Sequence, residues 1–196
     1  MMNITTPVTS NPLFLADNPA LDFINTQYGT GDQRHDCFTD DKSVLSWLRV
    51  AGLLPQEFED VAPEGLLALA RQLRDSSRAV VTAAMSGVAA DLNVINQVLE
   101  AGRPVRTLEW EEGARAFRMI SSPRDASPAS LLEPVAESLA SLVTHEKFEF
   151  VRHCEAHDCV LLFHDLTKSH RRRWCSMATC GNRMKVAAFR SRNKTQ

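Results

Sequence analysis

Four of the five cysteines in the 196-residue chain lie close together near its C-terminus. Cys154 and Cys159 are separated by four residues, Cys175 and Cys180 are also separated by four, and fifteen residues lie between the pairs. Thiolates are soft ligands, and structural zinc sites take four of them from two close pairs in a tetrahedral arrangement. The spacing therefore predicts a closed Zn²⁺ site formed by these four cysteines.

Other chemistry is open to the same cysteines. Two disulfides would suit an oxidising compartment, but the start of the chain lacks the basic and apolar regions of a secretory signal. No run of 18 apolar residues predicts a membrane span, so we expect a reducing cytoplasm, where grouped cysteines more often bind metal. An iron–sulfur cluster is a further alternative. A nearby histidine could also replace a cysteine as ligand, the candidates being His153, His157, His164 and His170.

The elements around the cysteines favour zinc. Residues 148–154 and 159–166 are β-prone, which places the first cysteine pair at the turn of a hairpin. The stretch after Trp174 reads as a turn leading into a helix, with Cys180 at the helix N-terminus, where the helix dipole favours a thiolate. A segment of about fifty residues has little core of its own, so metal binding should supply about 10 kcal/mol of its folding free energy.

Charge is distributed unevenly along the chain. Residues 1–147 carry 12 Lys and Arg against 20 Asp and Glu, a net charge of −8. Residues 148–196 carry 10 against 4, a net charge of +6. The two parts are therefore expected to meet different partners.

Residues 171–190, RRRWCSMATCGNRMKVAAFR, resemble the signature of the CGNR zinc-finger family, which takes its name from the residues found here as Cys180, Gly181, Asn182 and Arg183. The upstream residues 20–26, ALDFINT, are similar to a segment of the ABATE domain that precedes this finger. The resemblance implies a stress-induced transcription regulator in which the finger binds DNA and the N-terminal domain senses a signal.

Basic residues gather before and along the predicted C-terminal helix. A stripe of this kind favours contacts to DNA phosphates, whereas base discrimination requires specifically aimed side chains that the sequence does not identify. Val186 and Phe189 are expected to face the core. The alternative is a solvated helix whose Asn182 and Arg183 brace the zinc loop. The candidate DNA contacts are Arg171, Arg172, Arg173, Arg183, Lys185, Arg190, Arg192 and Lys194.

Helical periodicity dominates residues 1–145. Asn18 and Pro19 begin a short helix that Gly29 should end, with Leu21, Ile24 and Tyr28 inward. Further helices are predicted over residues 41–51, over 63–86 as the central helix, from Asp91 to Gly102 with Leu92, Ile95 and Leu99 inward, and over 130–144. Residues 105–110 and 114–120 predict a β hairpin, and residues 121–128 a loop.

Two polar groups in this region could form a ligand site. Asp22, Asn25 and Thr26 are predicted on the surface of the first helix, and an arginine stripe follows the central one. If they share a cleft they could bind a small anionic or polar ligand; otherwise they serve capping and solvation. The arginines are Arg71, Arg74 and Arg78. Cys37, beside His35 and Asp36, is a weaker candidate for a nucleophile or redox sensor.

The sequence predicts an α+β protein: a mainly helical N-terminal domain with a β hairpin over residues 1–145, and a treble-clef-like zinc finger over 146–196. The predicted function is transcription regulation through DNA. A protein-interaction module is the first alternative and an unrecognised enzyme in the N-terminal domain the second. Because no phosphate-binding glycine loop, serine nucleophile elbow or zinc-protease helix occurs, we expect a non-enzyme. No membrane partner and no particular oligomeric state are predicted.

Overall fold

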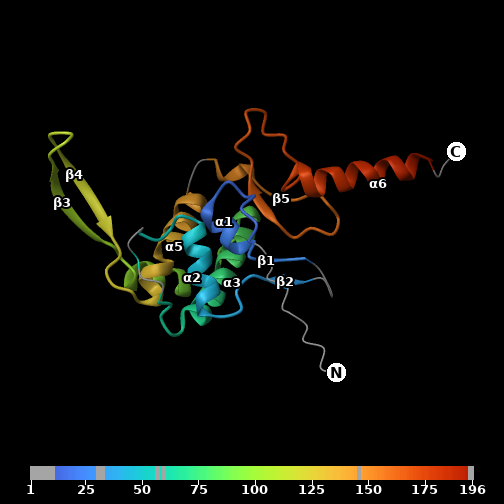
Figure 1. The fold of residues 1–196 in the computed structure, drawn as a ribbon. Coiled ribbons are helices and arrows are strands. Elements are labelled where there is room, and N and C mark those ends of the chain that lie inside the picture. Colours follow the sequence, from blue (N-terminus) through green and yellow to red (C-terminus); the bar gives the residue numbers. More distant parts are fainter. Residues whose placement is uncertain (1–11, 30–33, 56–57, 59–60, 145–146, 194–196) are drawn as a thin grey trace, which may run out of the picture.

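The computed structural model describes residues 12–29, 34–55, 58, 61–144 and 147–193, apart from the side chains of 191–193. It is an α+β protein, as predicted, with a helical body from which a β hairpin and a C-terminal helix project (Figure 1). In chain order the elements are α1 (Pro19–Ile24), β1 (Gln27–Tyr28), β2 (His35–Asp36), α2 (Asp41–Val50), α3 (Leu66–Met85), α4 (Asn93–Ala101), β3 (Val105–Glu111), β4 (Ala116–Ser122), α5 (Pro128–Thr144), η2 (Phe148–Phe150), β5 (Val151–His153), β6 (Leu162–His164), η3 (Met177–Gly181) and α6 (Asn182–Asn193).

Helix α1 starts as predicted but is shorter. The Asn18 side chain accepts hydrogen bonds from the amides of Ala20 and Leu21, and Pro19 takes the first helical position. The helix ends at Ile24 instead of continuing to Gly29, because Arg78 donates to the Ile24 carbonyl at 2.7 Å and the chain then enters β1. Strand β1 pairs antiparallel with β2.

The predicted central helix is α3, which contacts α1, α2, α4 and α5. Leu66, Ala70 and Leu73 lie on its buried face, and Ser77, where the apolar pattern is interrupted, is buried as well. Gly87, with φ +67°, follows the C-terminus of the helix. A buried face that runs along most of the helix, with Ser77 as an interruption, allows one helix to organise the core of the domain.

Helices α4 and α5 pack against each other and against α3. Helix α4 buries Ile95 and Val98; Leu92, predicted inward, is 46% exposed because it precedes the helix as its N-cap. Gly102 follows α4 where the backbones approach closely: a Cβ atom there would lie 2.3 Å from the Ala129 carbonyl oxygen. Any larger residue would push α4 away from α5.

The predicted hairpin forms from β3 and β4, which are seven residues each. It extends away from the helical body (Figure 1), and within the described parts of the chain neither strand makes extensive contact with any other element. Every side chain in the two strands is exposed except that of Ile120, which is half-buried. The hairpin is therefore an arm rather than part of the core.

The C-terminal module lies against the N-terminal body through β6, which packs on α1. The short strands β5 and β6 pair antiparallel, and η3 leads into α6. Val186 and Phe189 were expected to face the core, but they are 48% and 58% exposed. The reason is that, of the elements that the structure describes, α6 contacts only η3 extensively, and it then leaves the module (Figure 1). Among the described residues, no helix combines the length and apolarity needed to cross a bilayer.

Candidate metal centre and basic surface

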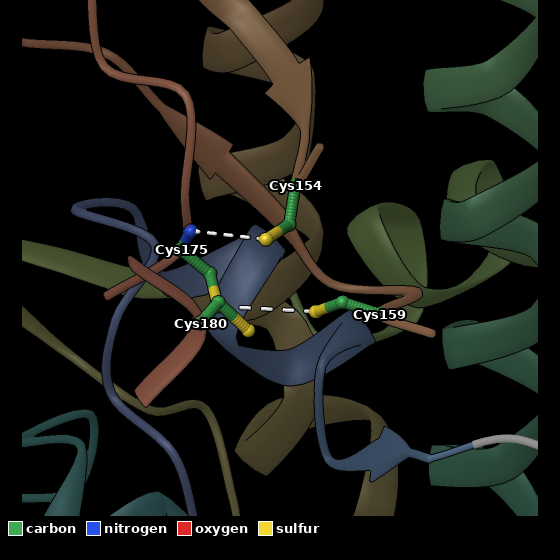
Figure 2. Close-up of side chains that lie close together, drawn as sticks. All are labelled: Cys154, Cys159, Cys175 and Cys180. Carbon is green, nitrogen blue, oxygen red and sulfur yellow. Dashed lines mark hydrogen bonds between the residues drawn. The ribbon is translucent and has the colours of Figure 1, made fainter. Parts of the chain in front are cut away.

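The four predicted cysteines come together from separate stretches of the chain. Cys154 follows β5, Cys159 lies in the turn of the β5–β6 hairpin, Cys175 precedes η3, and Cys180 lies within it. Figure 2 shows the four side chains converging. Their Sγ atoms all lie within 4.8 Å of one another, and three of the four side chains are buried. The hairpin and the knuckle before α6 therefore each supply two thiols.

The spacing of the sulfur atoms suits one tetrahedral ion. Cys175 Sγ lies 3.9 Å from Cys159 Sγ and 3.5 Å from Cys180 Sγ. A tetrahedron with metal–sulfur distances near 2.3 Å has sulfur–sulfur edges of about 3.8 Å. All four cysteines are free thiols, so the alternative of two disulfides is not adopted in this arrangement. The cluster is a metal site.

Crowding perturbs the acidity of these thiols. Hydrogen bonding from Cys175 lowers the pKa of Cys159 to about 5, and the same contact raises the pKa of Cys175. Burial raises the pKa of Cys180 to about 11. Without a cation the cluster thus favours one thiolate over several, whereas a divalent ion would allow all four thiolates to coexist.

No nearby histidine joins the group that could hold the ion, as far as the structure is described. His153 and His157 are exposed. The His164 ring contacts the Lys147 carbonyl at 3.1 Å, and His170 stacks on Phe150 with ring centroids 3.7 Å apart. Each histidine that the sequence raised as a substitute ligand is therefore placed elsewhere.

The residues after Cys180 support the knuckle. A Cβ atom at Gly181 would lie 2.7 Å from Met177 Sδ, so a side chain there would displace Met177. Arg183 donates to Cys180 Sγ at 3.4 Å and pairs with Asp158 at 2.8 Å, which ties the second cysteine pair to the hairpin turn. Asn182 Nδ2 donates to the Ala178 carbonyl at 3.4 Å. This geometry favours the alternative that the sequence left open, in which Asn182 and Arg183 brace the loop that carries the second cysteine pair.

Arg172 is the central brace of the module. Its guanidinium donates to the carbonyls of Leu15 and Cys175, both at 2.6 Å, and lies 4.3 Å from the centre of the Phe163 ring. It also pairs with the Asp17 carboxylate at 2.5 Å. These contacts join the N-terminal body to the segment that carries Cys175. Contact of Arg172 with DNA stays a prediction, and its placement favours a structural role.

The other predicted basic residues divide into paired and unpaired side chains. Arg173 pairs with Glu155 at 2.5 Å and lies over the Trp174 ring. Arg171, Lys185 and Arg190 are exposed, and within the described part of the chain they have no ion-pair partner. Lys194 lies outside the described residues, as does the side chain of Arg192. Among the predicted DNA contacts, the unpaired positive charge thus lies before η3 and along α6.

Asp22 and Asn25 are buried, although the sequence placed them on a helix surface. Asp22 Oδ1 accepts from the amides of Leu15 and Ala16 at 2.8 and 2.9 Å. Burial raises the pKa of Asp22 to about 6, against the lowering effect of those hydrogen bonds. The side-chain amide of Asn25 donates to the Leu162 carbonyl at 2.8 Å and accepts from the Leu162 amide at 3.0 Å. Asn25 therefore clasps β6 to the N-terminal body.

Thr26 and the arginines of α3 form a second buried network. Arg74, only 2% exposed, makes a bidentate pair with Asp36 at 2.6 and 2.7 Å and donates to Thr26 at 3.0 Å. Burial opposes ionisation of Asp36, but its hydrogen bonds with Arg74 hold its pKa below the usual value. Arg71 donates to the Phe38 carbonyl, and Arg78 to that of Ile24. The ligand site predicted for these residues stays a prediction; in the described structure each of the three arginines donates at least one hydrogen bond to another part of the fold.

Cys37 lies beside this network and is half-buried. Burial and the neighbouring Asp36 raise the pKa of its thiol. A raised pKa disfavours the thiolate that a nucleophile or redox sensor requires. The geometry therefore favours the plain structural interpretation of Cys37.

Sequence analysis did not single out Asp17 or Asp165. The fully buried Asp165 accepts from the amides of Thr167 and Arg172 at 3.1 and 2.8 Å and so shapes the loop that presents Arg172. Aspartate side chains commonly accept a hydrogen bond from the amide two residues later in a turn, so a turn at Asp165 and Thr167 could have been predicted from the sequence. The ion pair from Arg172 to Asp17 spans 155 residues, and no local pattern reveals it.

Two protein-family models match the chain, in the order that the residues indicate. The model described as "CGNR zinc finger" matches residues 151–193. The model named ABATE, described as "Putative stress-induced transcription regulator", matches residues 17–146. No curated protein matches the chain. Since the ABATE model covers well over half of the sequence and is followed by the zinc-finger model, the chain belongs to the ABATE family and carries a C-terminal CGNR finger.

Proposed function

We propose that the metal is Zn²⁺, held by Cys154, Cys159, Cys175 and Cys180. A set of four thiolates suits zinc, and a closed site of this kind leaves no coordination position for a substrate. The ion would supply structure: it would hold the β5–β6 hairpin against the knuckle that begins α6. Elemental analysis of protein purified under reducing conditions tests this, with one zinc per chain expected and iron or no metal contradicting it.

We further propose that the finger binds DNA and that the chain regulates transcription from the cytoplasm. One observation carries this proposal: α6 projects from the body (Figure 1) with Lys185 and Arg190 exposed and unpaired within the described chain, and Arg171 lines a pocket with Met177 of η3, the element that leads into α6. A twelve-residue helix is about 18 Å long, and a helix fits the major groove of B-DNA, which is about 12 Å wide.

The energetics of α6 support a bound state. An isolated helix of about twelve residues is only marginally stable in water, and among the described elements α6 packs closely on η3 alone. Phosphate contacts from Arg171, Lys185 and Arg190 would add affinity by releasing counterions and would stabilise the helix at the same time. The acidic N-terminal body would point away from the duplex, because α6 extends outward from it (Figure 1).

The N-terminal body is proposed to sense a ligand or partner and to act without catalysis. The contacts that would transmit such a signal are those from Asn25 to Leu162 and from Arg172 to Leu15 and Asp17. A change in the α1 region would therefore alter the position of β6 and the cysteine hairpin. The proposed signal is a molecule that binds the N-terminal body.

A salt titration of binding to a random DNA duplex tests the DNA proposal. With three phosphate contacts from Arg171, Lys185 and Arg190, the logarithm of affinity should fall with the logarithm of salt with a slope of about −3. Replacing each residue with Ala should reduce that slope by about 1 and weaken binding to all sequences alike. The matched control is Arg118→Ala, an exposed arginine on the distant hairpin. An absence of binding at low salt would contradict the proposal.

A protein-interaction module is the second candidate, favoured by the exposed apolar side chains Val186 and Phe189 on α6. In that case a double change to Asp at these positions would abolish partner binding, while the three basic substitutions would have little effect. Under the DNA proposal the order of these effects is reversed. The two sets of variants therefore separate the candidates.

A further inference from the structure

The β3–β4 arm has one apolar and one charged face. In its register Leu108 pairs with Met119, and Trp110 pairs with Phe117. Paired residues and residues two apart point to the same side of a strand pair, so these four side chains share a face. They are 63%, 61%, 47% and 71% exposed in that order. The opposite face carries Glu109 and Arg118 among its residues.

An uncovered face of this kind is poorly suited to a lone hairpin. Two strands by themselves are marginally stable in water, and the arm packs closely on no other described element. Trp110 and Phe117 meet edge to face with centroids 5.1 Å apart, which places a compact aromatic knob near the tip. The apolar face therefore gains most if a second surface covers it.

A cavity of about 880 Å³ lies at the base of the same arm. Arg106 and Ser121, which pair with each other, line it and point to the same side as Leu108 and Met119. Its walls also include Leu54, Leu99 and Pro104. One continuous surface thus runs from an aromatic knob at the tip, past Leu108 and Met119, into a cavity at the base.

We propose that two copies of this chain pair through these arms about a two-fold axis. Each apolar face would lie on the other, and Trp110 and Phe117 of each copy would enter the cavity of its partner. Knob and cavity lie on one face of one arm, and Leu108 and Met119 lie midway between them. An antiparallel pairing therefore satisfies both contacts at once and closes, instead of growing into a filament.

The dimensions fit such an exchange. Trp110 lies four residues from the cavity-lining Arg106 along β3, so about 14 Å of strand separates knob from cavity in both copies alike. Two such faces with their cavities would bury on the order of 1,000 Å² in total, the lower range of specific interfaces. A reversible dimer with a dissociation constant in roughly the micromolar range is therefore expected.

The chemistry of the cavity also suits the knob. Glu133 and Glu137 of α5 line its wall and can accept a hydrogen bond from the Trp110 indole N–H. Burial and the neighbouring Glu137 raise the pKa of Glu133, against the lowering effect of Arg106, so this carboxyl group would gain from a further hydrogen-bond donor. An indole donor from a second copy would supply one.

Sedimentation velocity of the metal-loaded chain, from about 1 to 200 µM, tests the proposal. We expect a concentration-dependent monomer–dimer equilibrium that the double variant Trp110→Asp, Phe117→Asp weakens at least 100-fold. The matched control is Thr107→Asp, Ala116→Asp, which adds the same charge to the opposite face of the arm and should change the dissociation constant less than 3-fold. A monomer at all concentrations, or a dimer that the first variant leaves intact, would overturn the proposal.

A second variant and a crosslink keep the test independent of hairpin folding. Ser141→Trp, at an exposed cavity-lining position of α5, should fill the cavity and weaken dimerisation at least 10-fold while the hairpin stays unchanged. A photoreactive phenylalanine at position 110 should crosslink to residues 52–55, 99–106 or 133–141 of the other copy. Crosslinks that map elsewhere, or only to another protein, would overturn the two-fold exchange. These measurements need no DNA, so they are independent of the proposed regulation.

Discussion

Two groups of arginines in this protein have opposite surroundings. Arg71, Arg74 and Arg78 of α3 direct their guanidinium groups to a carboxylate and to backbone carbonyls within the fold. Arg171 and Arg190 of the finger are exposed and have no ion-pair partner among the described residues. A cationic side chain whose donors are used within the chain stabilises the fold, whereas one whose donors face water is available to a polyanion.

The boundary between the groups passes through one arginine run. Arg171 faces solvent, while the next residue, Arg172, joins the N-terminal body to the Cys175 segment. The sequence presents three equivalent arginines, but the fold gives each one different partners. Charge composition alone therefore overstates the surface that can meet nucleic acid.

Metal removal should have the largest effect, because the finger contributes few core residues of its own. Cys175→Ser, or exhaustive chelation, should unfold the finger, with a loss on the order of 10 kcal/mol in the free energy of that module. Hydrogen exchange should accelerate in β5 and β6, and also near α1, which the Asn25 clasp links to β6. The control is Cys37→Ser, which changes the one cysteine outside the cluster and should leave the metal content at one ion per chain. Persistent protection of β6 after metal loss would show that the body alone holds the finger.

Arg74→Met should produce the next largest loss. It leaves the Asp36 carboxylate without its bidentate partner beside a buried Thr26 hydroxyl, so we expect a loss of about 3 to 5 kcal/mol in the free energy of unfolding. Urea denaturation measures it. Arg190→Met in the finger should cost less than about 0.5 kcal/mol, because that side chain is exposed. Equal losses in the two variants would remove the distinction between the groups.

Asn25→Ala tests the clasp between the body and the finger. The change leaves the amide and carbonyl of Leu162 without their partner, and we expect a loss of about 2 to 4 kcal/mol. Asn25→Asp should rescue only part of it, since a carboxylate accepts from the Leu162 amide but cannot donate to its carbonyl. Asn96→Ala, at an exposed position of α4 that is remote from the finger, serves as the control with little expected loss. An unchanged exchange rate at the Leu162 amide in Asn25→Ala would contradict the clasp.

Asp22→Asn should have the smallest effect, visible as a change in pH dependence. The pKa of Asp22 rises from 3.8 to about 6 on folding, because the side chain is buried. Protonated Asp22 therefore favours the folded state fully below about pH 4, and this contribution is lost as the pH rises through 6. The stability of the parent relative to Asp22→Asn should fall by on the order of 1 to 3 kcal/mol between pH 4 and 7. A difference that stays constant over that range would assign the pH dependence to other groups.

Elements whose signals are local could be predicted from the sequence. Asn18 and Pro19 start α1, the apolar period of α3 marks the central helix, and the β3–β4 hairpin forms around the residues that indicated it. The end of α1 could not be predicted, because Arg78, more than fifty residues away, takes the Ile24 carbonyl. The exposure of Val186 and Phe189 could not be predicted either. Helical spacing places apolar side chains on one face, but it does not show whether another element packs against that face.

By itself the sequence determined which four cysteines come together, because two close pairs of soft thiols suit one metal ion, and it determined the α+β class through local periodicity. Only the tertiary structure decided the use of each charged or amide side chain. Arg172, Asp22 and Asn25 are polar residues on apparently ordinary segments, and each is committed to a partner that only folding brings within reach. A hydrogen bond acts over about 3 Å, so its partner depends on where the chain returns and not on the neighbouring residues in the sequence.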